Sequence, residues 1–119
     1  MLTEIAARRR SQPAPPWAVF EDLCDPHRQP ARPWLELADD EVPPTVIEAL
    51  RPTRVDWSSL WPSRPDVRLR FELSASGGES MLRWGLWVDD PVPDADLVVH
   101  LRRRIDQLVN ANLRYTYGQ

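Results

Sequence analysis

The chain has 119 residues, the size of one domain, and its 42% apolar content with six tryptophans can supply one hydrophobic core. A net charge of -3 argues against nucleic acid as the main partner, because phosphate binding requires a concentrated basic surface. No apolar run is long enough to cross a membrane. With a single cysteine, Cys24, and no apolar leader, we expect a cytoplasmic protein consisting of one domain, residues 1–119.

In the first third of the chain, the sequence pattern clearly predicts one helix and little other regular structure. Residues 2–10 fit either a short helix or an edge strand, and the pattern leaves both open. Pro16 is well placed to open a helix, and apolar residues recur at helical spacing until Pro26. We therefore expect a helix over 16–25. A single helical turn is predicted over 34–37, followed by an acidic, proline-rich loop.

The middle of the chain predicts antiparallel strands at 45–50, 54–60, 67–73 and 80–88. The alternation is clearest in 67–73, where four apolar residues alternate with three charged ones, as in a half-buried strand. Ser76-Gly77-Gly78 supplies a hairpin turn between the last two strands. Both strands of this hairpin therefore turn an apolar face to the same core.

A long amphipathic helix is predicted over 93–115. Pro93 suits a first helical position, and Asp94 and Asp96 place negative charge near the positive end of the helix dipole. At 100° per residue, one side carries the apolar positions together with Asn112, namely Leu97, Val98, Leu101, Ile105, Leu108, Val109 and Asn112. The opposite side carries Asp96, His100, Arg103, Gln107, Asn110 and Arg114. A helix of about 22 residues spans about 33 Å, enough to cross a whole sheet.

Three stretches in this order, 15–26, 51–57 and 77–84, make the chain resemble the SRPBCC superfamily, which includes START domains, polyketide cyclases and heat-shock-protein ATPase activator homologues. The resemblance implies an α+β helix-grip fold, in which a curved antiparallel sheet of four to six strands packs on a long C-terminal helix. One or two short helices lie near the N-terminus. It also implies a hydrophobic cavity between sheet and helix. The segment 34–45 leaves no room for a further two-strand hairpin usual in the family, so we expect a shortened member with a smaller or more open cavity.

The leading hypothesis is a non-catalytic domain that holds a small hydrophobic ligand, lipid or polyketide-like, between the sheet and the C-terminal helix. The expected lining residues are Trp57, Ser59, Leu69, Phe71, Trp84, Leu86, Leu101, Ile105, Leu108 and Asn112. The aromatic members either line a pocket or fill the core. Asn112 needs a partner inside an apolar sector, either a ligand, or the backbone of the sheet or a buried water, and the sequence leaves these alternatives open.

Two other hypotheses come from different classes of protein. A protein-interaction module of the co-chaperone type is plausible by resemblance, and exposed Trp34, Trp61 or Trp87 would mark a homodimer or partner surface. A polyketide cyclase or aromatase would have only Asn112, Ser59 and Tyr115 as polar groups on the cavity side.

No catalytic constellation is apparent in the sequence. The acidic runs 39–41 and 89–90 lie beside prolines and are predicted to be solvated turns. His100 is expected to form a solvated ion pair with Asp96. Together with His27 and Cys24 it gives no metal-ligand spacing, so neither a metal nor a cofactor is expected.

Overall fold

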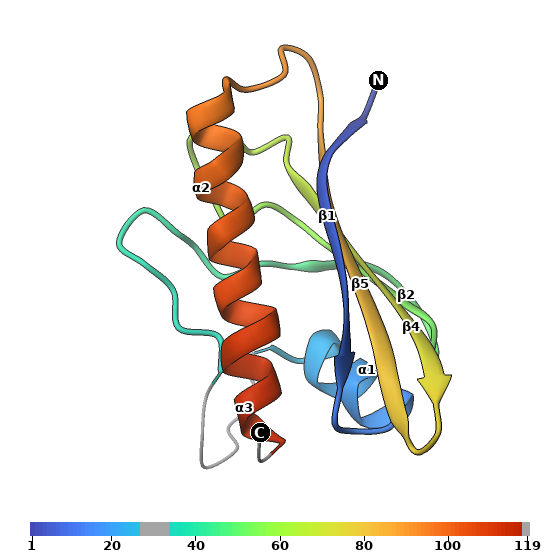
Figure 1. The fold of residues 1–119 in the computed structure, drawn as a ribbon. Helices are drawn as coiled ribbons and strands as arrows, with labels where there is room; N and C mark the ends of the chain where they lie inside the picture. Colours follow the sequence, from blue (N-terminus) through green and yellow to red (C-terminus); the bar gives the residue numbers. More distant parts are fainter. Residues whose placement is uncertain (27–33, 118–119) are drawn as a thin grey trace.

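In the computed structural model, which describes residues 1–26 and 34–117, five strands form one antiparallel sheet in the order β1-β5-β4-β3-β2 (Figure 1). The strands are β1 (Thr3–Gln12), β2 (Val46–Leu50), β3 (Arg54–Trp57), β4 (Arg68–Ser76) and β5 (Glu79–Val88). The helices are α1 (Pro16–Cys24), α2 (Ala95–Ile105), the π-helical segment η1 (Asp106–Leu113) and α3 (Arg114–Thr116). The predicted α+β class, with a short N-terminal helix and a long C-terminal one, is confirmed.

The ambiguous N-terminal segment is an edge strand. β1 pairs with β5 over its whole length, with one register shift between Glu4 and Ala6. Its side chains Arg8, Arg9 and Arg10 are all exposed. Charged residues on an edge strand discourage further strand addition, so this arginine run is consistent with a protected sheet edge.

The β4–β5 hairpin forms as the sequence pattern predicts. Ser76 pairs with Glu79, and the two residues between them, Gly77 and Gly78, have positive φ angles of 58° and 88°. Two positive φ values define a turn whose twist matches that of the flanking strands. The alternating apolar residues of both strands then face the same side of the sheet and are buried there.

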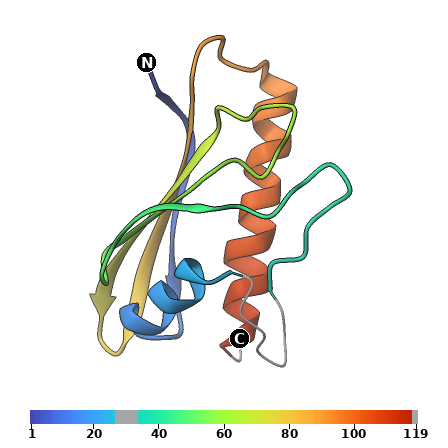
Figure 2. The ribbon, with the colours of Figure 1, turned by 180° about the vertical axis from the view of Figure 1, so that it is seen from behind.

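The C-terminal helix, formed by α2, η1 and α3 in succession, lies against this inner face of the sheet, and α1 covers its lower end (Figures 1 and 2). The helix begins at Ala95 because the side chain of Asp94 accepts a hydrogen bond of 2.9 Å from the Leu97 backbone N–H. Leu101, Ile105 and Leu108 are at most 1% exposed. None of the helices described is long and apolar enough to span a bilayer.

The second half of the helix departs from the 100° projection because η1 is π-helical. A π-helix bonds residue i to i+5, which widens the turn and rotates later residues relative to a straight α-helix. As a result Asn110, predicted on the polar side, is buried at 4% exposure, and Asn112, predicted at the centre of the apolar side, is only half-buried. The prediction for these two positions was therefore wrong.

Two predictions about tryptophans and loops also fail. Residues 34–37 form no helical turn. Trp34 and Trp61 are core residues, 4% and 2% exposed, instead of surface residues, because their loops fold back onto the sheet–helix layer. Trp87 does lie on the outer face of the sheet, where it is half-buried. The exposed tryptophan is Trp17 on α1, at 63%.

The helix stripe gives a stability prediction. Replacement Ile105→Ala is expected to lower the free energy of unfolding by about 2–5 kcal/mol, because it leaves a cavity in a packed core. The matched control Val99→Ala, on the outer side of the same helix and 43% exposed, is expected to change it by less than about 0.5 kcal/mol. Urea denaturation followed by circular dichroism measures both values; equal effects would contradict the packing described.

Candidate functional site

The layer between the sheet and the C-terminal helix holds eight of the ten residues predicted to line a ligand site. All eight are at most 1% exposed: Trp57, Leu69, Phe71, Trp84, Leu86, Leu101, Ile105 and Leu108. These side chains belong to one hydrophobic core, in which they are closed off from solvent. Four pockets lined by described residues lie elsewhere, on the outer sheet face, beside the 58–65 loop and along the polar side of η1.

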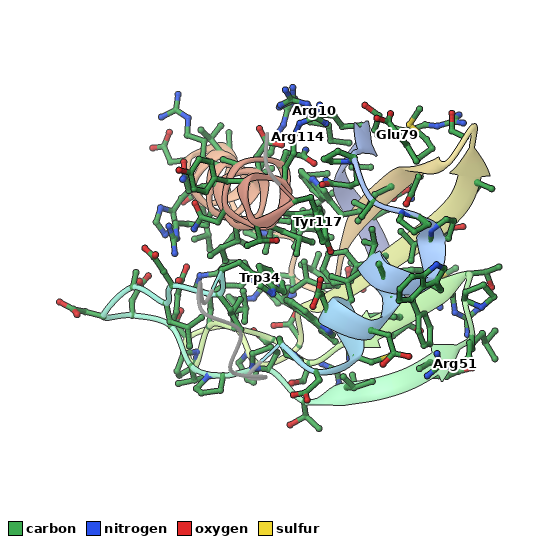
Figure 3. The ribbon with its side chains drawn as sticks, turned by 90° about the horizontal axis from the view of Figure 1, so that it is seen from below. Arg10, Trp34, Arg51, Glu79, Arg114 and Tyr117 are labelled. Carbon is green, nitrogen blue, oxygen red and sulfur yellow. The ribbon has the colours of Figure 1, made fainter. Side chains whose placement is uncertain are left out.

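An aromatic stack occupies the centre of this layer. The Trp34 ring stacks on Trp57 with centroids 5.9 Å apart, and Trp57 meets Phe71 edge to face at 4.7 Å. The Trp57 Nε1–H donates to the Leu23 carbonyl at 2.8 Å, which satisfies its buried N–H. Trp57 and Phe71 belong to strands, but Trp34 lies in a segment without regular secondary structure, beside the helix that Figure 3 shows end-on.

The polar residues predicted for the cavity have other roles. The Ser59 hydroxyl donates to the Arg64 carbonyl at 2.8 Å and accepts from the Trp61 N–H at 2.9 Å, so it shapes a loop beyond the end of β3. Asn112 donates its amide to the Trp34 carbonyl at 3.3 Å, a backbone group of a loop and not of the sheet. Tyr115 is 58% exposed. Of these three groups, Ser59 borders the pocket beside the 58–65 loop, which lies outside the layer between sheet and helix.

A buried ion pair that the sequence did not predict joins the acidic loop to the helix. Arg104 donates to both carboxylate oxygens of Glu41, at 2.7 and 2.8 Å, and the Trp61 Nε1–H donates to the same carboxylate at 3.1 Å. The Glu41 side chain is completely buried. Burial raises the pKa of Glu41, but the hydrogen bonds from Arg104, the Ala38 N–H and Trp61 outweigh it and hold the pKa below its ordinary value. Glu41 is therefore a structural clamp and not a solvated turn residue.

A second polar contact fastens the end of β1 to η1. The fully buried Gln12 donates weakly to the Val109 carbonyl at 3.4 Å and to Asn110 at 3.5 Å, while its own Oε1 has no partner among the described residues. Asn110 donates to Asp106 at 2.6 Å. Arg114 donates to the backbone carbonyl of Ser11, the residue that precedes Gln12 in β1.

The remaining titratable candidates do not form a reactive centre. His100 lies 3.5 Å from Asp40, a pairing with the acidic loop instead of the predicted Asp96, and both side chains are about half exposed. Burial raises the pKa of the Cys24 thiol, which opposes a nucleophilic role. Among residues 1–26 and 34–117, no three His, Cys, Asp or Glu side chains come together as a metal site. His27 lies outside the described residues.

Sequence patterns offered no signal for the most buried polar groups. Glu41 ends a run of acidic residues that looks like an ordinary loop, and Arg104 ends a run of arginines. Gln12 precedes a proline at the end of an ambiguous segment. Only their three-dimensional partners distinguish them from solvated neighbours.

The Glu41–Arg104 pair gives a pH-dependent prediction. Because the folded-state pKa of Glu41 is depressed, its contribution to stability is present above its unfolded value, near 4.5, and is lost as the pH falls through the lower folded value. Replacement Glu41→Gln is expected to cost about 1.5–3 kcal/mol at pH 7, since it removes charged hydrogen bonds, and progressively less as the pH falls below about 4.5.

The matched control is Glu48→Gln, which breaks the exposed Glu48–Arg54 pair of 2.7 Å and is expected to cost less than about 1 kcal/mol. Urea titrations of the three proteins between pH 3 and pH 7 make the comparison. A difference between wild type and Glu41→Gln that does not shrink in acid would contradict the assigned charge.

Comparison with known proteins finds solved structures of the same fold but no family that matches in sequence. No protein-family model and no curated protein matches the sequence. CalU16 from Micromonospora echinospora superposes with a TM-score of 0.66 at 16% identity, over 92% of this chain and 78% of that one. The Aha1 dimer protein from Colwellia psychrerythraea gives 0.64 at 12% identity, over 88% and 90%.

A third solved structure, DynU16, a protein of the dynemicin biosynthetic locus, gives a TM-score of 0.68 at 18% identity, over 95% of this chain. The match spans only 47% of the DynU16 chain. Residues 34–45 form no strand, which agrees with the expectation that this segment has no room for a further hairpin. At these identities the likeness shows the fold alone: this chain has the helix-grip architecture that the three solved structures share.

Proposed function

We propose that this chain is a non-catalytic binding domain that holds a small, flat hydrophobic molecule, such as a lipid-like or polyketide-like compound, between the sheet and the C-terminal helix. The observation that carries the proposal is the aromatic stack of Trp34, Trp57 and Phe71 in that layer. The fold of the chain is also similar to that of DynU16, a protein of a biosynthetic locus.

Because side chains fill the layer, a ligand that enters it must displace one of them. Of the three stacked aromatic side chains, Trp34 is held least firmly. Trp57 and Phe71 are fixed by paired strands, since they lie opposite Leu69 and Trp84 in the sheet register. The Trp34 carbonyl is bonded to the Glu36 N–H at 3.0 Å and to Asn112 at 3.3 Å, and neither bond belongs to a strand ladder. Such a segment opens at lower cost than a core strand.

A flat ligand would restore the stacking contact on Trp57 that is lost when the Trp34 indole moves away. The face of Trp57 that Trp34 covers is a planar aromatic surface inside an apolar layer, and an aromatic or fused-ring ligand offers the same stacking contact. The ten predicted lining residues then divide by role. The eight buried apolar residues form the walls, Asn112, which bonds Trp34, is the polar group at the entrance, and Ser59 lies in a loop outside the site.

The test uses the neutral fluorescent probe N-phenyl-1-naphthylamine. Replacement Trp34→Ala vacates the proposed site, so it is expected to bind the probe about tenfold more tightly than the wild type. Trp34→Leu, which keeps more of the packing, is expected to give an intermediate value. The exposed Trp17→Ala serves as control and is expected to leave the affinity unchanged, with circular dichroism to verify that each variant is folded.

Flat titrations for wild type and both Trp34 variants would contradict the proposal. An equal gain in affinity for the probe in Trp17→Ala would also contradict it, because the probe would then be reporting loosened packing anywhere in the protein.

A second candidate, a protein-interaction module, is favoured by two observations. The layer between sheet and helix is filled, and Trp17 projects from α1 with 63% of its surface exposed. One turn further along α1, Glu21 binds Arg51 of the β2–β3 turn, whose guanidinium lies 4.8 Å over the Phe20 ring. A second copy of the chain is one partner that such a module could bind, and native mass spectrometry tests for this homodimer. A dimer that the replacement Trp17→Ala dissociates, and that carries no small molecule, would favour this candidate over the first.

A further inference from the structure

The outer face of the sheet, opposite the helix, carries a trough of about 300 Å³, and Leu69 is the one residue of the proposed ligand layer that also borders it. It crosses the strands from Leu2, just before β1, to Ile47 on β2, and Arg68, Arg70, Trp87 and Asp56 lie between them. Its volume lies at the small end of the range for small-molecule sites, about 300–1,000 Å³. Leu2 and Ile47 are 47% and 52% exposed, so its two ends are apolar and open to solvent.

The charges in this trough do not cancel. Asp56 accepts a two-point contact from Arg70, at 3.0 and 3.3 Å, which neutralises both groups. Arg68 instead donates to two backbone carbonyls, those of Pro65 and Val67, each at 3.1 Å. The two arginines and one aspartate that line the trough therefore leave one positive charge, at Arg68.

Arg68 differs in this respect from the other outward-facing arginines of β3, β4 and β5. Arg54 pairs with Glu48 at 2.7 Å, Arg70 with Asp56, and Arg83 with Glu4 at 2.5 Å. Within the described chain, Arg68 has no carboxylate partner. Its two carbonyl contacts fix the guanidinium in place, so an incoming anion meets a donor that is already oriented.

Trp87 lies directly opposite Arg68 in the β4–β5 register, which places an aromatic surface next to the positive charge. Its Nε1–H is buried and unpartnered among the described residues. A Cβ added to Gly85 would lie 3.2 Å from that nitrogen and 2.6 Å from Glu4 Oε1, so the indole N–H is turned against the sheet over Gly85. The carbon atoms of the ring are therefore what the trough presents.

From this arrangement we propose that the outer-face trough binds a small amphipathic carboxylate, with its carboxylate on Arg68 and its aromatic or branched apolar body between Trp87, Leu2 and Ile47. The single uncompensated positive charge favours a ligand with one negative charge. The apolar ends of the trough favour a ligand with a hydrophobic body over a fully hydrophilic one. The site is independent of the layer between sheet and helix.

The experiment compares 4-phenylbutyrate with its neutral analogue 4-phenylbutyramide, titrated into the ¹⁵N-labelled protein while the Trp87 indole N–H signal is followed. The carboxylate is expected to bind at least tenfold more tightly than the amide. Arg68→Gln is expected to weaken the carboxylate about tenfold and leave the amide unchanged, because it removes the charge alone. Ile47→Ser is expected to weaken both compounds.

Two controls separate this site from other effects. Arg83→Gln changes an outer-face arginine that does not line the trough and is expected to leave both affinities unchanged. Trp34→Leu alters the layer between sheet and helix and is likewise expected to have no effect. Equal binding of acid and amide, equal weakening by Arg83→Gln, or no shift of the Trp87 signal would each overturn the proposal.

Discussion

The burial of one helix stripe against one face of a sheet is the interaction on which the rest of this structure depends. Leu101, Ile105 and Leu108 supply the helix side, and the alternating apolar residues of β4 and β5 supply the sheet side. A hairpin alone is marginal in water, and so is an isolated helix of this length. Each becomes stable because it removes the apolar surface of the other from solvent.

The segment 34–45 is attached to that two-layer core through side chains. The 34–45 segment is held by Glu41, whose buried carboxylate is bound by Arg104 of the helix, and by Trp34, whose indole stacks on Trp57. These two attachments differ in kind. A buried charge left without its partner is costly, so the Glu41 contact is a firm anchor. The Trp34 contact is apolar, and under the proposed function a flat ligand that took the place of Trp34 would restore the stacking on Trp57. A closed interior and a binding function are thus compatible.

Regular patterns in the sequence were sufficient to predict the fold, but not the polar contacts. Alternation in 67–73 and the paired glycines at 77–78 specified the central hairpin, because period and turn chemistry are local properties. The helix projection placed the buried residues correctly through Val109 and failed at Asn110 and Asn112, because the π-helical segment changes the rotation per residue and the sequence pattern did not predict that segment. Glu41 and Trp34 were misplaced because burial of a loop residue depends on partners that are distant in sequence, Arg104 and Trp57.

The most direct test of the account is to ask which side of the C-terminal helix faces the aromatic rings of the sheet. Nuclear Overhauser spectra with labelled methyl groups answer this in solution. The account predicts contacts from the methyl groups of Leu101, Ile105 and Leu108 to the ring protons of Trp57, Phe71 and Trp84, and none from the methyl groups of Val99. Contacts from Val99 to those rings, or an absence of contacts from Ile105, would contradict it.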